Sequence, residues 1–492
     1  MAAPGPVLTT DGAVRSTVPA RLDRLPWARF HTRVVVALGI CWILDGLEIA
    51  MVAGIAETLQ RSETLALTAS MIGWSASLYL LGQVIGALWF GRLADRLGRR
   101  RLFITTIVLY LVASGLSGFA WNFWSFAVCR FAAGLGIGGE YGAINSAIDE
   151  LIPPHRRGWV DIGVNGTYWG GAMLAAGAQM LLLNPELLPI DLGWRIGVLS
   201  GPIIGLLVWR LRRHIPESPR WMMTHGRADE AERVVTEIER QLEADGHELL
   251  PVGPERAIEI RPQTTVPYRE IARVMFGTYP TRTLLGASLM ITQSFLYNAI
   301  FFTSGLILAT FYGVTEQAIG YFLFPFAFGN LAGAVILGRL FDTWGRRRMI
   351  SGSYLLAAVL LAFSGYLFYT GALSAFSQTV IWCVIFFFAS AGASSAYLTV
   401  SEIFPIEFRA QAIAFFFALA QFFGGVVAPA LFGYLIEASD GGADATPLFV
   451  GYLIGAGLMA VGGLVALFFA VDAEGRSLED IAPPLSAVRR DG

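Results

Sequence analysis

The feature that most constrains this chain is an eleven-residue pattern that occurs twice. The first copy reads Gly91-Arg-Leu-Ala-Asp-Arg-Leu-Gly-Arg-Arg-Arg101, and the second reads Gly338-Arg-Leu-Phe-Asp-Thr-Trp-Gly-Arg-Arg-Arg348. Each copy lies between two long apolar segments, with glycine, arginine, aspartate and the arginine run in register. A basic turn that arose by chance would explain one copy only. The repeat therefore predicts that one half-molecule is used twice.

The apolar segments are long enough to cross a bilayer, which takes about 20 residues of helix. Hydrophobic residues make up 55% of the chain and charged residues only 15%, which excludes an ordinary soluble domain. We predict twelve transmembrane helices in two sets of six. The expected spans are about 33–57, 70–91, 102–121, 123–149, 158–183 and 194–213, then about 282–312, 317–340, 349–371, 378–403, 410–437 and 447–471.

The predicted layout has five parts. They are an N-terminal tail (1–32), a six-helix bundle (33–213), a helical linker (214–281), a second six-helix bundle (282–471) and a C-terminal tail (472–492). The first 30 residues lack the apolar core of a signal peptide. Arginine clusters fall on one side of the predicted helices and acidic loops on the other. The positive-inside rule then puts both tails and the linker in the cytoplasm.

Ionisable residues inside the apolar spans are candidate functional residues, because each costs roughly 2.5–3.5 kcal/mol at the bilayer centre on insertion scales. Asp45 and Glu48 lie three residues apart and share one helix face. Counted from Arg33, Glu48 lies roughly 22 Å from the cytoplasmic side, and Arg130 lies about 20 Å from it. Equal depth predicts a Glu48–Arg130 ion pair that protonation of Glu48 would release. The alternative is a static pair that locks two helices together.

Together these motifs resemble the major facilitator superfamily, and its sugar porter family in particular. The doubled turn is similar to the superfamily's loop 2–3 motif, and the resemblance runs from about 33 to 482. It implies an all-α integral membrane protein with the major facilitator fold. The other matching stretches are Glu150-Leu-Ile-Pro-Pro-His-Arg-Arg-Gly158, its echo Glu402-Ile-Phe-Pro-Ile-Glu-Phe-Arg409, Pro216-Glu-Ser-Pro-Arg220 and Glu474-Gly-Arg-Ser-Leu-Glu-Asp-Ile481.

The resemblance implies a cytoplasmic gate, in which carboxylate–guanidinium pairs hold the inner helix ends together while the outside is open. The alternative is that these charges only fix topology and helix packing. The expected pairs are Asp95 with Arg99, Glu150 with Arg157, Asp342 with Arg346, and Glu402 with Arg409.

Proton coupling is also implied by the resemblance. Proton-driven sugar porters place an acid in the first helix and an arginine in the fourth, at what look like the positions of Glu48 and Arg130. Asp45-Gly-Leu-Glu48 is similar to a signature of aromatic-acid:proton symporters. Glu140 resembles an acid of metabolite and phosphate symporters and is a further candidate. Solvation of a helix end is its alternative role.

Comparison with sugar porter motifs gives the candidate substrate ligands. Asn165 stands where the fifth helix usually has Gln, and Gln293 and Asn298 match two amides of the seventh-helix motif. Thr292 replaces the first Gln of that motif, which departs from the hexose pattern. The remaining aromatic and amide side chains suit a small, flat or carboxylated metabolite. The full set is Asn165, Tyr168, Trp169, Gln293, Asn298, Tyr397 and Gln421, and the alternative role of each is interhelical packing or hydrogen bonding.

We therefore expect a secondary active transporter of the bacterial inner membrane. It would carry a small organic solute (a carboxylated or aromatic metabolite, or a sugar) with protons by alternating access. An uncoupled sugar facilitator is the alternative, and a non-transporting sensor is less favoured because the tails are short. The apolar segments hold no nucleophile–base pair or metal cluster, so we expect no enzyme activity, metal or cofactor. The expected partners are solute, protons and lipid, without nucleic acid, and we expect a monomer.

Overall fold

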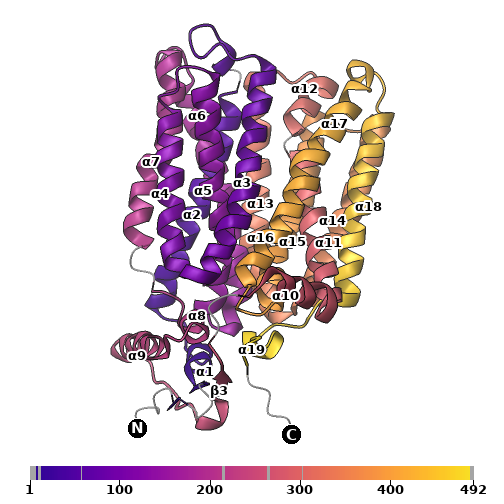
Figure 1. Ribbon diagram of the computed structural model, residues 1–492. Helices are drawn as coiled ribbons and strands as arrows, with labels where there is room; N and C mark the ends of the chain where they lie inside the picture. Colours follow the sequence, from indigo (N-terminus) through magenta and orange to yellow (C-terminus); the bar gives the residue numbers. More distant parts are fainter. Residues whose placement is uncertain are drawn as a thin grey trace.

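The computed structural model describes residues 7–8, 13–56, 58–212, 216–262, 266–301 and 303–487. Within them, it describes the backbone alone at residues 7–8, 69–70, 99, 207–212 and 316–317. Two bundles of long helices stand side by side, and a smaller, polar assembly covers one end of them (Figure 1). That end carries the described residues nearest to the two ends of the chain, and the opposite end is called the far end below.

The first bundle contains six long helices, which run alternately toward and away from the far end (Figure 1). Side chains cap those that start at the far end: Thr68 accepts a hydrogen bond from the Met71 N–H before α3, and Asn122 accepts one from Ser125 before α5. The helices are α2 (Arg29–Gly54), α3 (Ala69–Leu97), α4 (Arg99–Ser117), α5 (Phe123–Leu151), α6 (Arg157–Leu182) and α7 (Ile190–Arg212).

The second bundle repeats this order, but two of its six long helices are interrupted by π-helical turns. The first long helix of this bundle consists of α11 (Pro280–Leu296), a π-helical turn (Tyr297–Phe301) and α12 (Ser304–Tyr312). The fifth consists of α16 (Arg409–Ala420), a π-helical segment (Gln421–Val427) and α17 (Ala428–Glu437). The other four are α13 (Glu316–Thr343), α14 (Arg346–Tyr369), α15 (Ala375–Ile403) and α18 (Thr446–Phe469).

In the described part of the chain, nine helical segments are long and apolar enough to cross a membrane. The three other long helices, α5, α6 and α7, are 29, 26 and 23 residues long. With these three, the total agrees with the twelve predicted spans. The predicted all-α membrane fold is confirmed, with Arg130, Glu140 and Glu150 among the charges that lower the hydropathy of α5.

The repeated turn has the same backbone shape in both bundles. Gly98 has φ 96° and ψ 155°, and Gly345 has φ 97° and ψ 149°. Residues with a Cβ rarely adopt this region, so glycine is needed in both copies. Each glycine joins two helices of its bundle, α3 to α4 and α13 to α14. The turn thus repeats in conformation as well as in sequence.

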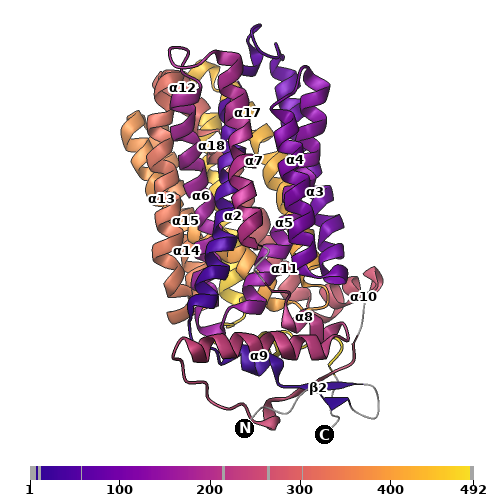
Figure 2. The ribbon, with the colours of Figure 1, turned by 90° about the vertical axis from the view of Figure 1, so that its left-hand side faces the viewer.

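A small folded unit, called the terminal module, covers the end opposite to the far end. Its core consists of Val18 and Leu22 from the N-terminal segment, packed with Trp221, Val235 and Ile238 of the linker. In Figure 2 its longest helix, α9, lies across the bundle ends. The module comprises β1 (Val7–Leu8), β2 (Val14–Ser16), α1 (Val18–Asp23), α8 (Pro219–Thr224), α9 (Ala228–Ala244), a 3₁₀ turn (Pro254–Arg256) and β3 (Ile258–Ile260).

Three distant parts of the chain meet in one sheet of this module. Strand β2 pairs antiparallel with β1 and β3, with Val14 opposite Ile260, and Ile260 also bridges to Ala487. The tail predicted at 1–32 is therefore folded from Val14 onward, since its apolar residues pack against α9. In the linker, α10 (Tyr268–Arg273) and a π-helical turn (Val274–Thr278) follow β3, and α19 (Leu478–Ile481) lies after α18.

Candidate functional site

A cavity of about 520 Å³ lies between the two bundles. Its lining reaches Leu59, in the connection between α2 and α3 at the far end, and ends near Tyr141 and Asn165 in the direction of the terminal module. The structure brings all seven predicted substrate-binding residues to its wall. These are Asn165, Tyr168, Trp169, Gln293, Asn298, Tyr397 and Gln421.

Aromatic side chains from both bundles form the inner end of this cavity. Trp42 and Tyr141 of the first bundle meet edge to face, with ring centroids 4.9 Å apart. Tyr141 stacks on Phe417 of the second bundle at 4.7 Å, and Trp42 lies 6.2 Å from Tyr397. A second group stacks Trp169 on Tyr297 at 5.5 Å. These rings give a flat, apolar surface against which an aromatic solute could stack.

Two π-helical segments place amide side chains in the wall. Asn298 lies in the first segment and donates to the Ser294 carbonyl. Gln421 opens the second and donates from Nε2 to Gln83 Oε1 of the first bundle at 2.7 Å. π-Helical turns often occur at functional sites, because the extra residue redirects the side chains around it. The amide pair Gln83–Gln421 joins the two bundles across the cavity.

The predicted Glu48–Arg130 pair is present. Arg130 Nη1 donates to Glu48 Oε1 at 2.6 Å, and both side chains are buried. The Arg130 guanidinium lies 4.3 Å from the centre of the Tyr79 ring and lines the cavity. Glu48 Oε2 has no hydrogen-bond partner among the described residues. One Glu48 carboxylate oxygen thus pairs with the arginine, and the other meets no hydrogen-bond donor in the part of the chain that the structure describes.

The other two predicted coupling residues, Asp45 and Glu140, lie in different surroundings. Asp45 is buried on α2, and its charge reaches the hydroxyls of Tyr141 and Tyr168 in the cavity wall. Glu140 is buried on α5, ten residues from Arg130 and hence about 15 Å along the helix, outside the cavity lining. The structure groups Asp45 with the cavity and Glu140 with the packed end of the bundle.

At the module end, each repeated aspartate caps a helix of the opposite bundle. Asp342 Oδ1 and Oδ2 accept hydrogen bonds from the Gly158 and Trp159 N–H groups in the first turn of α6, at 3.0 and 2.7 Å. Asp95 Oδ2 accepts from the Gln411 N–H in the first turn of α16, at 3.1 Å. Neither helix has an N-cap side chain of its own. A carboxylate there satisfies orphan N–H groups and faces the positive helix end.

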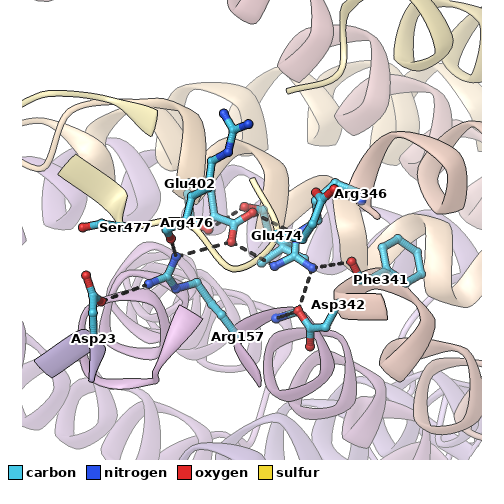
Figure 3. Close-up of polar contacts among 12 residues, drawn as sticks. Asp23, Arg157, Phe341, Asp342, Arg346, Glu402, Glu474, Arg476 and Ser477 are labelled. Carbon is cyan, nitrogen blue, oxygen red and sulfur yellow. Dashed lines mark hydrogen bonds and ion pairs between the residues drawn. The ribbon is translucent and has the colours of Figure 1, made fainter. Parts of the chain in front are cut away.

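The predicted gate residues form ion pairs both within the second bundle and between the two bundles. Arg346 holds Glu402 through two hydrogen bonds of 3.0 and 3.1 Å and also contacts Asp342 at 2.8 Å, as predicted. Arg157 of the first bundle approaches Glu402 of the second at 3.6 Å. Figure 3 shows Arg157 and Arg346 converging on this glutamate.

The partners of Glu150 and Glu402 differ from those expected from the sequence. Arg409 of the second bundle lies 3.8 Å from Glu150 of the first. The sequence placed Glu150 with Arg157 and Glu402 with Arg409, each within one bundle, because a linear reading cannot register one bundle against the other. Arg99 is the predicted partner of Asp95, and its side chain lies outside the part of the chain that the structure describes. With the caps, these contacts close the module end while the cavity reaches the far end.

Some cavity residues were not predicted from the sequence. Tyr79 and Gln83 lie four apart on α3, and Trp42 lies three residues before Asp45 on α2. Helical spacing from a known candidate could have identified Trp42 as cavity-facing. Nothing in the apolar pattern of α3 distinguishes Gln83 from a packing residue. In the described residues, no group of three His, Cys, Asp or Glu side chains is placed to hold a metal ion.

Comparison with known proteins matches residues 34–484 to the family model "Sugar (and other) transporter". The niacin transporter NiaP of Acinetobacter baylyi is 28% identical over 463 residues, which cover 94% of this chain and 99% of that protein. The benzoate transport protein of the same species is 24% identical, with 92% of each chain covered.

Solved structures of the xylose symporter XylE share the fold at 20–21% identity. A structure of the proton:xylose symporter XylE bound to 6-bromo-6-deoxy-D-glucose superposes with a TM-score of 0.76, covering 92% of this chain and 98% of that one. The inward open conformation of XylE from Escherichia coli gives a TM-score of 0.60, at 21% identity and with 92% and 99% of the chains covered.

Proposed function

Because the chain belongs to the sugar (and other) transporter family of multi-pass membrane transporters, we propose that it is a proton-coupled symporter of a small aromatic carboxylate. It is a transporter and not an enzyme. The observation that carries the proposal is the buried Glu48–Arg130 pair, whose arginine lines the cavity and whose glutamate has one oxygen without a hydrogen bond to any described residue.

In the proposed mechanism, the solute carboxylate replaces Glu48 on Arg130. An ionised Glu48 neutralises the buried arginine when the cavity is empty. When Glu48 takes a proton it releases the guanidinium, which would then be an uncompensated buried cation. A solute carboxylate restores the neutral pairing, and a guanidinium binds carboxylates well through its planar array of donors. Proton and anion therefore bind together, and the loaded and empty sites carry the same charge.

The walls of the cavity support an aromatic solute. Trp42, Tyr141 and Trp169 offer ring faces, and Asn298 and Gln421 offer amides that can hydrogen-bond a ring heteroatom or substituent. The substrates named for two relatives, niacin and benzoate, each combine an aromatic ring with a carboxylate. A nicotinate-sized anion is the member of this class that we propose.

The proposed sidedness puts the terminal module and both chain termini in the cytoplasm of a bacterium, with the protein in the inner membrane. Arginine-rich turns at the module end support this orientation. The conformation is then open to the outside and closed to the cytoplasm. Alternating access would require the contacts of Asp95, Asp342 and Glu402 between the bundles to break, while those near the far end form.

Uptake of radiolabelled nicotinate into proteoliposomes tests the proposal. A pH gradient, alkaline inside, should drive accumulation above that of protein-free liposomes, which measure passive entry of the neutral acid. An inside-negative membrane potential alone, set with potassium and valinomycin, should drive none, because one proton and one anion carry no net charge. Accumulation driven by the potential alone would contradict the replacement of Glu48 by the solute.

Two other outcomes point to the alternatives. Equilibration of nicotinate without accumulation under either gradient would identify an uncoupled facilitator. Uptake of a sugar, and not of nicotinate, would retain the transporter but overturn the substrate class. A purified protein that binds nicotinate and never moves it would support a non-transporting sensor.

A further inference from the structure

Two buried carboxyl groups near the module end take no part in the gate contacts described above. Asp149 lies in the last turn of α5, and Asp161 lies one turn into α6, four residues after Arg157. Both residues have 0% exposed surface. Their charges interact with each other, so they face the same interior region.

Among the described residues, none of the four oxygens of Asp149 and Asp161 accepts a hydrogen bond. The hydroxyl and the amide that lie beside the two carboxyl groups donate to other acceptors. The Ser401 hydroxyl, beside Asp149, donates to the Leu398 carbonyl at 2.9 Å. The Asn165 amide, beside Asp161, donates to Asn145 Oδ1 at 3.2 Å and to the Asp161 main-chain carbonyl at 2.8 Å. Neither group is left to solvate a carboxylate.

The surrounding charges leave this region with an excess of acid. Asp149 faces Glu402, Arg157 and Arg409, whereas Asp161 faces Asp149, Glu402 and Arg346. The arginines also serve other carboxylates: Arg346 holds Glu402 and Asp342, Arg157 approaches Glu402, and Arg409 lies near Glu150. The cluster thus contains five carboxyl groups (Asp149, Glu150, Asp161, Asp342 and Glu402) and three guanidinium groups (Arg157, Arg346 and Arg409).

An ionised carboxylate that is buried without hydrogen bonds is strongly disfavoured, and such a group takes up a proton instead. Two acids close together in one dry region cannot both ionise without further cost. We propose that Asp149 and Asp161 form a second proton-binding site, separate from Glu48, which holds a proton while the module end is closed and releases it when that end opens to water.

A polar connection links this pair to the cavity. Asn165 lines the cavity and donates to Asn145, which is buried on α5 one turn before Asp149. On the other side of the pair lie Glu402 and Arg157, at the contact between the bundles. Opening of that contact would hydrate both aspartates and favour their ionised forms. The site would thereby respond to the pH on the module side. Its role in transport depends on the proposed proton coupling, but its protonation does not.

Infrared difference spectroscopy of the purified full-length protein near pH 7 tests the protonation directly. The parent is Glu48→Gln, which removes the other proposed proton carrier. Adding Asp149→Asn and Asp161→Asn should remove a carbonyl band of a protonated carboxylic acid. Ser146→Ala, on the same face of α5, is the matched control and should leave that band in place. Loss of ionised carboxylate bands alone would overturn the proposal. If the double variant does not fold, each single Asn variant is measured in the same way for loss of the carbonyl band.

Nicotinate exchange in right-side-out vesicles tests the role of the pair. In the Glu48→Gln parent, the exchange rate should rise as the internal pH rises, because deprotonation of the pair favours opening on that side. The Asp149→Asn/Asp161→Asn variant should lose this dependence. An unchanged pH dependence would mean that another group releases the proton. If nicotinate is not carried at all, the proposed function fails, and the infrared result still decides the state of the pair.

Discussion

Replacing Glu48 by Gln removes one negative charge and keeps the shape of the side chain. The variant resembles the protonated state permanently, so Arg130 stays available to a solute carboxylate. We expect exchange of nicotinate across the membrane to persist, since exchange needs no net proton release. Accumulation driven by a pH gradient should fall to the level of protein-free liposomes. Counterflow measures exchange, and uptake under a pH gradient in the same vesicles measures accumulation. Normal accumulation by the variant would place the proton site elsewhere, and Glu140 would be the next candidate.

Asp45→Asn is the matched comparison on the same helix face. Asp45 lies one turn from Glu48, and its charge reaches Tyr141 and Tyr168 of the cavity wall. We expect it to weaken nicotinate binding and to leave the ratio of accumulation to exchange close to that of the wild type. A loss of coupling as large as that of Glu48→Gln would show that the two acids share the proton.

For single residues, the useful sequence signal was the depth of a side chain in the membrane. Counting residues along two helices predicted that Glu48 and Arg130 meet, because helical rise is regular and both helices span the same slab. The partners of Glu150, Arg157, Glu402 and Arg409 could not be predicted in this way. They depend on the conformation in which the two bundles are held, which is a property of the tertiary contact and not of either helix.

Among the elements, the capped helices α6 and α16 are the most sensitive to a change of state. Their first turns lack side-chain caps of their own and take them from Asp342 and Asp95 of the opposite bundle. An Asn side chain can still accept these hydrogen bonds but lacks the negative charge, whose interaction with a helix N-terminus contributes about 0.3–1 kcal/mol. Asp95→Asn or Asp342→Asn should therefore shift the balance toward the state that is open at the module end by up to about fivefold, since 1.4 kcal/mol is one decade.

The measurement for these variants is equilibrium binding of nicotinate beside its exchange rate. Binding should change little, because neither aspartate lines the cavity, whereas the rate should fall. Glu237→Gln, at an exposed position on α9, is the control for removal of an acid outside the gate. Loss of binding with an unchanged conformational balance would contradict the capping role.

Element boundaries show where sequence patterns were informative. Apolar length predicted most of the spans, but it placed the starts of α4 and α14 at 102 and 349, three residues after the observed starts at Arg99 and Arg346, because the arginine run that opens each helix is polar. The π-helical segments at Tyr297–Phe301 and Gln421–Val427 were not predictable, because an inserted residue leaves the overall apolar length unchanged. The folding of Val14–Asp23 was also missed, since a three-residue strand and a six-residue helix have too few residues for a periodic signal.

For the whole molecule, Arg220 joins the N-terminal segment, the linker and the C-terminal segment. It contacts Asp23 at 2.5 Å and also pairs with Glu479. Burial alone would raise the pKa of Glu479, but the charge and hydrogen bonds of Arg220 outweigh it and lower that pKa to about 2. The ordinary value is 4.5, so the stabilisation is fully present above about pH 4.5 and is lost as the pH falls toward 2.

We therefore expect Glu479→Gln to lower the stability of the terminal module by up to about 3 kcal/mol at neutral pH, since one pKa unit corresponds to 1.36 kcal/mol. The difference from the wild type should stay constant down to about pH 4.5 and shrink as the pH is lowered further toward 2. Hydrogen exchange of α8 and α9 in the purified protein measures it. A difference that stays constant with pH would mean that Glu479 acts through packing and not through its charge.

The shared sheet of the terminal module also bears on the order of biogenesis. Val14 pairs with Ile260, and Ile260 in turn pairs with Ala487. During synthesis, β2 is made first and can pair with β3 only after more than two hundred further residues have been translated. The contact of Ile260 with Ala487 forms only when nearly the whole sequence has been made. A nascent chain halted after the first bundle would therefore leave the apolar residues Val18 and Leu22 of α1 without the linker residues that cover them in the finished protein.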